Sequence, residues 1–98
     1  MESKGIKYLE KEFKGSGEVQ GYHFKRVKQT GLVAMYEVWY DRIFHYEVFK
    51  RRINNQYDIE TYPSAKQFGK TAFTTFDKEY AEKLFKKLQE KEEARINK

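Results

Sequence analysis

Apolar and polar residues alternate with a period of two along most of the stretch from Val19 to Ile53. Two breaks, Thr30-Gly31 and Asp41-Arg42, divide this stretch into three runs. Alternation of this kind predicts half-buried strands, and short breaks that contain Gly, Asp or Thr predict the turns between them. The segment is therefore expected to form three antiparallel strands joined by two hairpin turns.

Two further strand-like segments follow. Asn54-Asn55 ends the third run, and residues 56–62 alternate weakly until Pro63 stops them. This pattern fits either a short edge strand or a structured loop. Residues 70–76 follow Gly69 and are rich in aromatic and β-branched side chains, which predicts a final strand.

The apolar period changes to that of a helix after Phe76. Asp77 is a typical N-cap residue, and Phe76 before it is expected to pack on Ala81 as a hydrophobic staple. The helix should place one apolar stripe against the sheet, made of Ala81, Leu84, Phe85 and Leu88. Because the stripe ends at Leu88, residues 91–98 are expected to form an exposed, fraying tail.

Residues 1–18 form a separate N-terminal segment. Ile6, Leu9 and Phe13 have helical spacing, and Gly15-Ser16-Gly17 after them favours a helix end and a flexible joint. A short helix is one option for this segment, which would then cover a sheet edge, contact a partner subunit or fray. Together these patterns predict an α+β protein. Its antiparallel sheet has four or five strands and one C-terminal helix on one face, in a single domain at residues 19–90.

The two hairpins also predict which side chains share a face of the sheet. If both turns contain two residues, paired positions sum to 61 in the first hairpin and to 83 in the second. One face then carries the row Tyr22, Trp39 and Phe44, and the aromatic residues of the other face include Tyr36, Tyr40 and Phe49. The helix covers one of these faces and leaves the other open for binding. A β-bulge or a longer turn would exchange the two faces.

The amino-acid composition limits the cellular compartments in which the protein is expected. The 98-residue chain contains no cysteine, which excludes a disulfide-stapled scaffold and a thiolate zinc site and favours a reduced cytoplasm. The longest apolar stretch, Leu32 to Tyr36, is far shorter than a membrane span, and the start of the chain lacks the apolar core of a signal peptide. We therefore expect a cytoplasmic protein that does not bind a membrane.

The formal net charge of +5 is concentrated on the strand segment. Residues 19–56 have seven basic and three acidic side chains, whereas residues 1–18 and residues 57–76 are each balanced. Residues 77–98 have seven basic and six acidic side chains. This distribution favours attraction of a polyanion to the sheet, and it fits equally well a basic surface that keeps the protein in solution.

The strand segment has more aromatic side chains than one sheet face needs, and they alternate with basic residues. Rings on a sheet stack with the bases of a single strand, and Lys or Arg beside them neutralise phosphates. The predicted stacking residues are Tyr22, Phe24, Trp39 and Tyr46, and the predicted phosphate contacts are Arg26, Lys28, Lys50 and Arg52. The alternative interpretation is structural: Trp39 lies in the core under the helix, and the basic run at residues 50–52 protects a strand end from edge pairing.

Few residues suggest catalysis. His23, His45 and Glu47 would share one face in the expected register, which superficially resembles a metal or acid–base site. This set falls short of the converging ligands of a secure zinc site, and the sequence contains neither a nucleophile elbow nor a Gly-rich phosphate loop. We therefore expect a non-enzymatic protein without a metal or a cofactor.

Three motifs carry a resemblance to known proteins: YEVFKRR at residues 46–52, YPSAKQFGKTAFTTF at residues 62–76 and DKEYAEKLFKKL at residues 77–88. Over about the last half of the chain, their order resembles small uncharacterised proteins of phages and mobile elements of the Bacteroidota. That resemblance implies a strand-rich domain with one C-terminal helix, encoded on an element that manipulates nucleic acid or its host, and it implies no activity. The order of strands and helix also resembles the Whirly and Pur single-stranded nucleic-acid-binding folds, whose signature motifs are absent here.

Two functions fit these patterns. The first is binding of single-stranded nucleic acid through an aromatic and basic sheet face. The alternative is a protein-binding accessory factor, such as a phage inhibitor of a host protein or a structural adaptor, because Tyr, Trp and Arg are also enriched at protein interfaces. A homodimer formed through a sheet edge or through the terminal helices is an option in either case.

Overall fold

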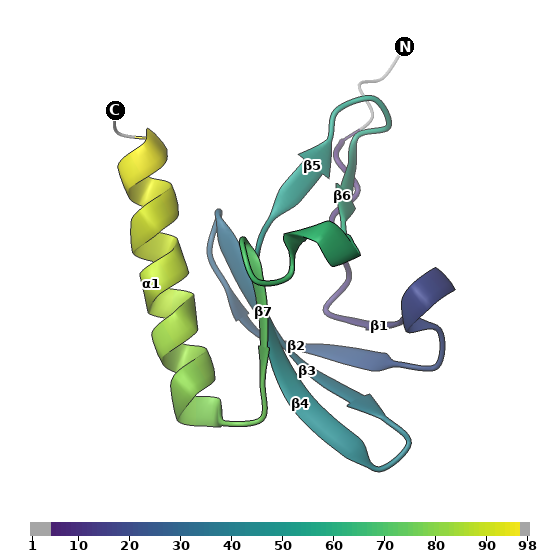
Figure 1. Ribbon diagram of the computed structural model, residues 1–98. Helices are drawn as coiled ribbons and strands as arrows, with labels where there is room; N and C mark the ends of the chain where they lie inside the picture. Colours follow the sequence, from purple (N-terminus) through teal and green to yellow (C-terminus); the bar gives the residue numbers. More distant parts are fainter. Residues whose placement is uncertain (1–4, 97–98) are drawn as a thin grey trace.

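A computed structural model describes residues 5–96 of the chain (Figure 1). Five strands pair antiparallel in the spatial order β1 (Glu12–Lys14), β2 (His23–Gln29), β3 (Val33–Tyr40), β4 (Ile43–Lys50) and β7 (Ala72–Thr75). A separate hairpin contains β5 (Arg52–Asn54) and β6 (Ile59–Thr61), and the chain ends in the helix α1 (Lys78–Ile96). Short 3-10 helices lie at Gly17–Val19 and Ala65–Gln67. The predicted α+β class, with a five-stranded antiparallel sheet and one C-terminal helix, is confirmed.

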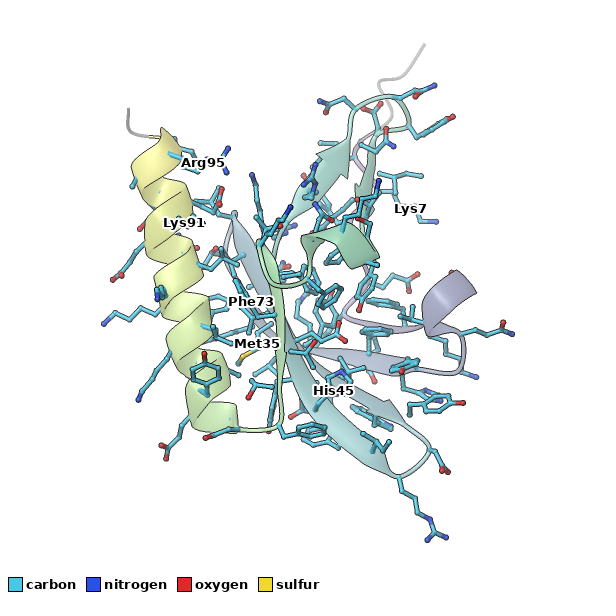
Figure 2. All side chains as sticks on the ribbon, in the orientation of Figure 1. Lys7, Met35, His45, Phe73, Lys91 and Arg95 are labelled. Carbon is cyan, nitrogen blue, oxygen red and sulfur yellow. The ribbon has the colours of Figure 1, made fainter. Side chains whose placement is uncertain are left out.

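The helix lies along one face of the sheet and packs on β3, β4 and β7 (Figure 1). The core on this side contains alternate strand residues and the helix stripe: Val33, Met35, Tyr46, Val48, Ala81, Phe85 and Leu88. Figure 2 shows Met35 and Phe73 on this side of the sheet. The Asp77 carboxylate accepts hydrogen bonds from the backbone N–H groups of Glu79 and Tyr80, at 2.9 and 3.4 Å, which confirms it as the N-cap.

The opposite face of the sheet has a core of its own. Its buried residues are Phe24, Ala34, Tyr36, Val38, Phe49 and Ala72. The side chains that pack over them come from the N-terminal segment and from the loop before β7, and include Leu9, Phe13, Val19, Tyr62 and Phe68. The expectation that the face without the helix is left open was therefore wrong over most of its area, since two irregular segments form a second covering layer.

The N-terminal segment is extended between Gly5 and Lys14, so a short helix there is excluded. Its backbone groups pair with other segments: Lys7 N–H donates to the Asp58 carbonyl at 2.8 Å, and the Lys11 carbonyl accepts from Arg26 N–H at 2.7 Å. Leu9 and Phe13 are four residues apart, which fits one helical turn and also two strand repeats. The extended form is favoured because it satisfies the free edges of β2 and β6.

The predicted register was right for the second hairpin and wrong for the first. In the second hairpin, pairs run from Val33 with Lys50 to Tyr40 with Ile43, as expected for a two-residue turn. The first hairpin has a longer turn and a bulge between Arg26 and Lys28. At its far end the pairs are therefore shifted by one residue, so His23 and not Tyr22 lies beside Trp39. Three predicted site residues, Tyr22, Phe24 and Arg26, lie on the face opposite to Trp39 as a result.

Two local predictions at the ends of α1 also differ. Residues 91–96, expected to fray, are exposed apart from Glu92 but remain helical, because Glu92 is 3% exposed and its Oε1 lies 3.3 Å from Lys50 Nζ. The last two residues of the expected tail, 97–98, lie outside the described part of the chain. Phe76 does not staple onto Ala81 but is 72% exposed, with its ring edge on His45. Among residues 5–96, no helix has the length and apolar content needed to cross a membrane.

Candidate nucleic-acid interface

The side chains predicted to bind nucleic acid do not form one surface. Phe24 and Tyr46 are 2% and 8% exposed and belong to the two cores. Lys28 and Lys50 point toward α1, where each forms an ion pair with a glutamate of the helix. These four side chains are engaged in holding the sheet layers together.

The remaining predicted residues lie at separate places. The Tyr22 ring stacks on Tyr40 with ring centres 4.7 Å apart and planes at 22°, on the face opposite to the helix. Arg26 lies further along β2 on that same face, and Arg52 is exposed on the hairpin strand β5. Trp39 is partly exposed on the helix side of the sheet.

Trp39 belongs to a row of rings across the three central strands. His23 on β2 stacks on Trp39 with centres 6.3 Å apart and planes at 14°, and Phe44 on β4 lies 6.1 Å from Trp39 on its other side. We call these three residues the ring ladder. His23 and Phe44 are exposed, the latter by 42%, because α1 packs on the other end of this face. The ladder therefore presents partly exposed rings to solvent.

The edge strand β1 places a lysine beside the ring ladder. Lys14 pairs with His23 across β1 and β2, and a shallow hollow of about 240 Å³ lies between Lys14, His23 and Trp39. The neighbouring row contains Lys25 between two carboxylates, Glu12 on β1 and Glu37 on β3. The ladder is thus flanked by lysines, with a charge close to balance on its own face.

A second, more basic surface lies at the other end of β1. Lys11 precedes this strand, and its side chain, Arg26 and Arg51 line a hollow of about 660 Å³ between the N-terminal segment, β2 and β5. We call it the basic hollow. The side chains of Tyr8 and Ile53 contribute apolar wall. Lys11 and Lys14 are three residues apart, about 10 Å on an extended strand. The ring ladder is on the helix side and Arg26 is on the opposite side, so the edge strand β1 connects the ladder with the basic hollow around the edge of the sheet.

The histidines and the carboxylate considered for catalysis do not converge. His23 lies on the helix side of the sheet, whereas His45 and Glu47 are buried on the opposite side, with Nε2 to Oε2 at 2.9 Å. The Tyr62 hydroxyl donates to the other oxygen of Glu47, and burial followed by the Glu47 charge raises the pKa of Tyr62 far above its ordinary value. Within residues 5–96, no three His, Asp or Glu side chains are grouped to hold a metal ion.

Sequence reasoning missed several residues of these surfaces. His23 was assigned to the other face because the bulge in β2 has no clear sequence signal. Tyr8, Lys11 and Lys14 were missed because the N-terminal segment was interpreted as a helix. The four-residue spacing of Leu9 and Phe13, which fits two strand repeats as well as one helical turn, was the one available signal for an edge strand there.

Comparisons of this chain with protein-family models, with curated proteins and with solved structures find no match.

Proposed function

We propose that the protein is a non-enzymatic module that binds single-stranded nucleic acid along the β1 edge of its sheet. Bases stack on the ring ladder of His23, Trp39 and Phe44, and the phosphate backbone follows Lys14 and Lys11 toward the basic hollow. The observation that carries the proposal is the ladder itself, an ordered series of partly solvent-facing rings on the end of the sheet that α1 does not cover.

The arrangement of the ring ladder is better suited to stacking with nucleic-acid bases than to packing in a protein core. Rings held by paired strands keep a fixed spacing, and each base that stacks on such a ring gains about 1–3 kcal/mol. The ladder residues also contact each other across strands and contribute to sheet stability, which keeps them ordered without a ligand. A single strand is favoured over a duplex because only unpaired bases expose their faces.

The positions of the basic residues support the path proposed for the bound nucleic-acid strand. Beyond the ladder, Lys14, Lys11 and Arg26 lie along β1 and the neighbouring part of β2, and none of them forms an ion pair within residues 5–96. Backbone phosphates are neutralised by side chains of this kind, and the resulting affinity falls as salt rises. The lack of cysteine fits a role in a reducing cytoplasm.

Binding of a fluorescently labelled oligo(dT) at two salt concentrations tests the proposal. Trp39→Ala is expected to weaken binding by about 5- to 150-fold, which corresponds to about 1–3 kcal/mol for one stacked base. Tyr57→Ala is the matched control, because Tyr57 is 65% exposed on the distant β5–β6 turn. Equal losses in the two variants, or binding of the wild-type protein that does not respond to salt, would contradict the proposal.

The alternative function is a protein-binding accessory factor. It is favoured by the row Glu12, Lys25 and Glu37 beside the ladder, because alternating charges next to exposed rings are typical of protein interfaces. Affinity capture from a host lysate with and without nuclease separates the two functions. Partners that remain after nuclease favour the accessory factor, and their loss favours nucleic acid. The proposed homodimer is tested in the same preparation by light scattering.

A further inference from the structure

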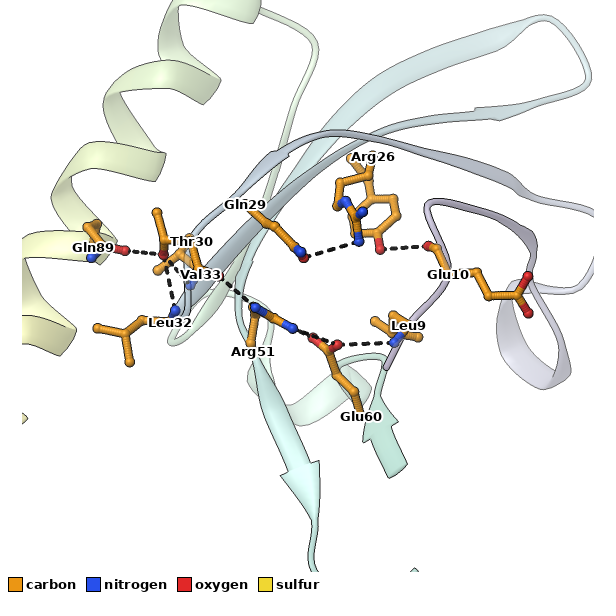
Figure 3. Close-up of polar contacts among 11 residues, drawn as sticks. Leu9, Glu10, Arg26, Gln29, Thr30, Leu32, Val33, Arg51, Glu60 and Gln89 are labelled. Atoms are coloured by element: carbon orange, nitrogen blue, oxygen red, sulfur yellow. Dashed lines mark hydrogen bonds and ion pairs between the residues drawn. The ribbon is translucent and has the colours of Figure 1, made fainter. Parts of the chain in front are cut away.

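The basic hollow is built from three segments that are distant in sequence. Its walls are the N-terminal segment with Tyr8 and Lys11, the end of the β2–β3 hairpin with Arg26, and the start of β5 with Arg51. Figure 3 shows the side chains of Arg26 and Arg51 at this place, with the Glu10 carboxylate pointing away from both. A cleft of about 660 Å³ has the size of a small-molecule site.

One arginine of the hollow is held rigidly. Arg51 donates from Nε and Nη2 to the two oxygens of Glu60, at 2.8 and 3.1 Å, and from Nη1 to the Thr30 carbonyl at 2.7 Å. Its guanidinium also lies over the Tyr8 ring, 5.5 Å from the centre. Arg51 therefore contributes a fixed wall with its charge largely compensated by Glu60, and some of its N–H groups remain available to a ligand.

The other two cations of the hollow have no carboxylate partner among the described residues. Arg26 Nη1 donates to Gln29 Oε1 at 3.2 Å, a neutral acceptor that orients the guanidinium without cancelling its charge. Lys11 also lines the hollow and lies beside Arg26, because its carbonyl accepts from Arg26 N–H at 2.7 Å. The buried hydroxyl of Tyr36 lies beside Arg26 and donates to the Glu10 carbonyl at 2.9 Å. The hollow thus keeps about two uncompensated positive charges next to apolar wall.

The elements around the hollow limit how a nucleic-acid strand can pass through it. A nucleic-acid strand that runs along β1 from the ring ladder meets the β5–β6 hairpin at the far end of the hollow. Figure 1 shows this hairpin rising away from the sheet. Ile53 of β5 lines this end of the hollow, so a nucleic-acid chain that continues beyond this point has to pass the β5–β6 hairpin. The position fits the end of a strand better than its middle.

We infer that the basic hollow binds a phosphate monoester through Arg26 and Lys11 and, on the basis of the proposed strand binding, that this group is the terminal phosphate of the bound strand. A monoester carries up to two negative charges and three terminal oxygens, which match two cations and the free N–H groups of Arg51. A phosphodiester within a strand carries one charge and gains less from the same site. A free nucleotide has the same monoester chemistry and is the second source of ligand that the experiment separates.

The experiment compares twelve-residue oligo(dT) with a 5′-phosphate, a 3′-phosphate or hydroxyl ends, together with thymidine monophosphate alone. One phosphorylated end is expected to raise affinity about tenfold or more over the hydroxyl-ended strand, as for charge-assisted hydrogen bonds. Arg26→Gln should abolish this advantage, so that the phosphorylated and the hydroxyl-ended strands bind the variant with equal affinity, even though the loss of one phosphate contact weakens all of them. Arg42→Gln is the matched control, because Arg42 is exposed at the β3–β4 turn.

A second readout follows the ³¹P resonance of the terminal phosphate, which should shift in the wild-type complex and not in the Arg26→Gln complex. Lys11→Gln provides an independent variant at an exposed position if Arg26→Gln does not fold. Equal affinities for all three strands overturn the terminal-phosphate assignment while strand binding, and with it the proposed function, stands. If no strand binds, the proposed function fails, and thymidine monophosphate decides the monoester site: an Arg26-dependent ³¹P shift supports it, and no shift overturns it.

Discussion

Replacement of Glu60 by alanine is expected to destabilise the whole fold, although the residue lies in a three-residue strand at the margin of the molecule. Glu60 is 3% exposed. Its carboxylate accepts two hydrogen bonds from Arg51 and one from Leu9 N–H at 3.0 Å, and Arg51 in turn binds the Thr30 carbonyl. The pair therefore joins the N-terminal segment, the β2–β3 turn and the β5–β6 hairpin.

The magnitude follows from the charge that is left behind. Glu60→Ala leaves the mostly buried guanidinium of Arg51, 13% exposed, without its counter-charge, which costs about 3–5 kcal/mol. A domain of this size has a free energy of unfolding of about 5–15 kcal/mol, so the variant loses a large fraction of its stability. At about 4–8 °C per kcal/mol, the melting temperature should fall by about 12 °C or more.

Urea and thermal denaturation followed by circular dichroism measure this loss. Glu90→Ala, at an exposed position of α1, is the matched control and should stay within about 0.5 kcal/mol of wild type. The double variant Arg51→Met with Glu60→Ala should be more stable than Glu60→Ala alone, because the unpaired charge is removed. A Glu60→Ala variant within about 1 kcal/mol of wild type, or strictly additive effects in the double variant, would refute the reasoning.

Three further predictions concern the helix and the second core. Asp77→Ala should lower the free energy of unfolding in urea by about 0.5–2 kcal/mol through loss of the N-cap bonds, and no change would contradict that role. Phe85→Ala should lower the free energy of unfolding by about 3–5 kcal/mol, whereas Phe76→Ala, at a 72% exposed position, should lower it by less than about 0.5 kcal/mol. Similar losses in the two variants would contradict the assignment of Phe85 to the core and of Phe76 to the surface. Burial and Glu47 raise the pKa of Tyr62, so the folded state keeps a proton that the unfolded state loses above about pH 10. Stability should therefore be fully present below pH 10 and fall above it, with a slope smaller by about 1.4 kcal/mol per pH unit in Tyr62→Phe; an unchanged slope in urea titrations would contradict this.

The parts of the fold that sequence reasoning predicted are those with a local physical signal. Asp41 adopts a φ of 56°, which an aspartate tolerates in a two-residue turn, and the register of the second hairpin follows from that turn. Likewise, Asp77 and the apolar stripe ending at Leu88 mark the start and the buried face of α1.

The parts that sequence reasoning missed depend on contacts between distant segments. The bulge in β2 moves His23 beside Trp39, and nothing in the sequence near Val27 distinguishes a bulged strand from a regular one. The second covering layer arises because Leu9 and Tyr62 come together over the same face, although more than fifty residues separate them. The spacing of residues along the chain does not indicate which distant segments come into contact. The candidate site depends on both the bulge in β2 and the second covering layer.

Intrinsic fluorescence of Trp39 tests the central proposal most directly, because this residue is the one tryptophan of the chain and lies in the middle of the ring ladder. Titration with unlabelled oligo(dT) at low salt is expected to quench its emission to a plateau as bases stack on the ring. The midpoint should shift to higher strand concentration as salt rises, with a logarithmic slope of about −0.7 for each phosphate contacted. Emission that stays unchanged at low salt and saturating strand would contradict stacking at Trp39 and with it the proposed interface.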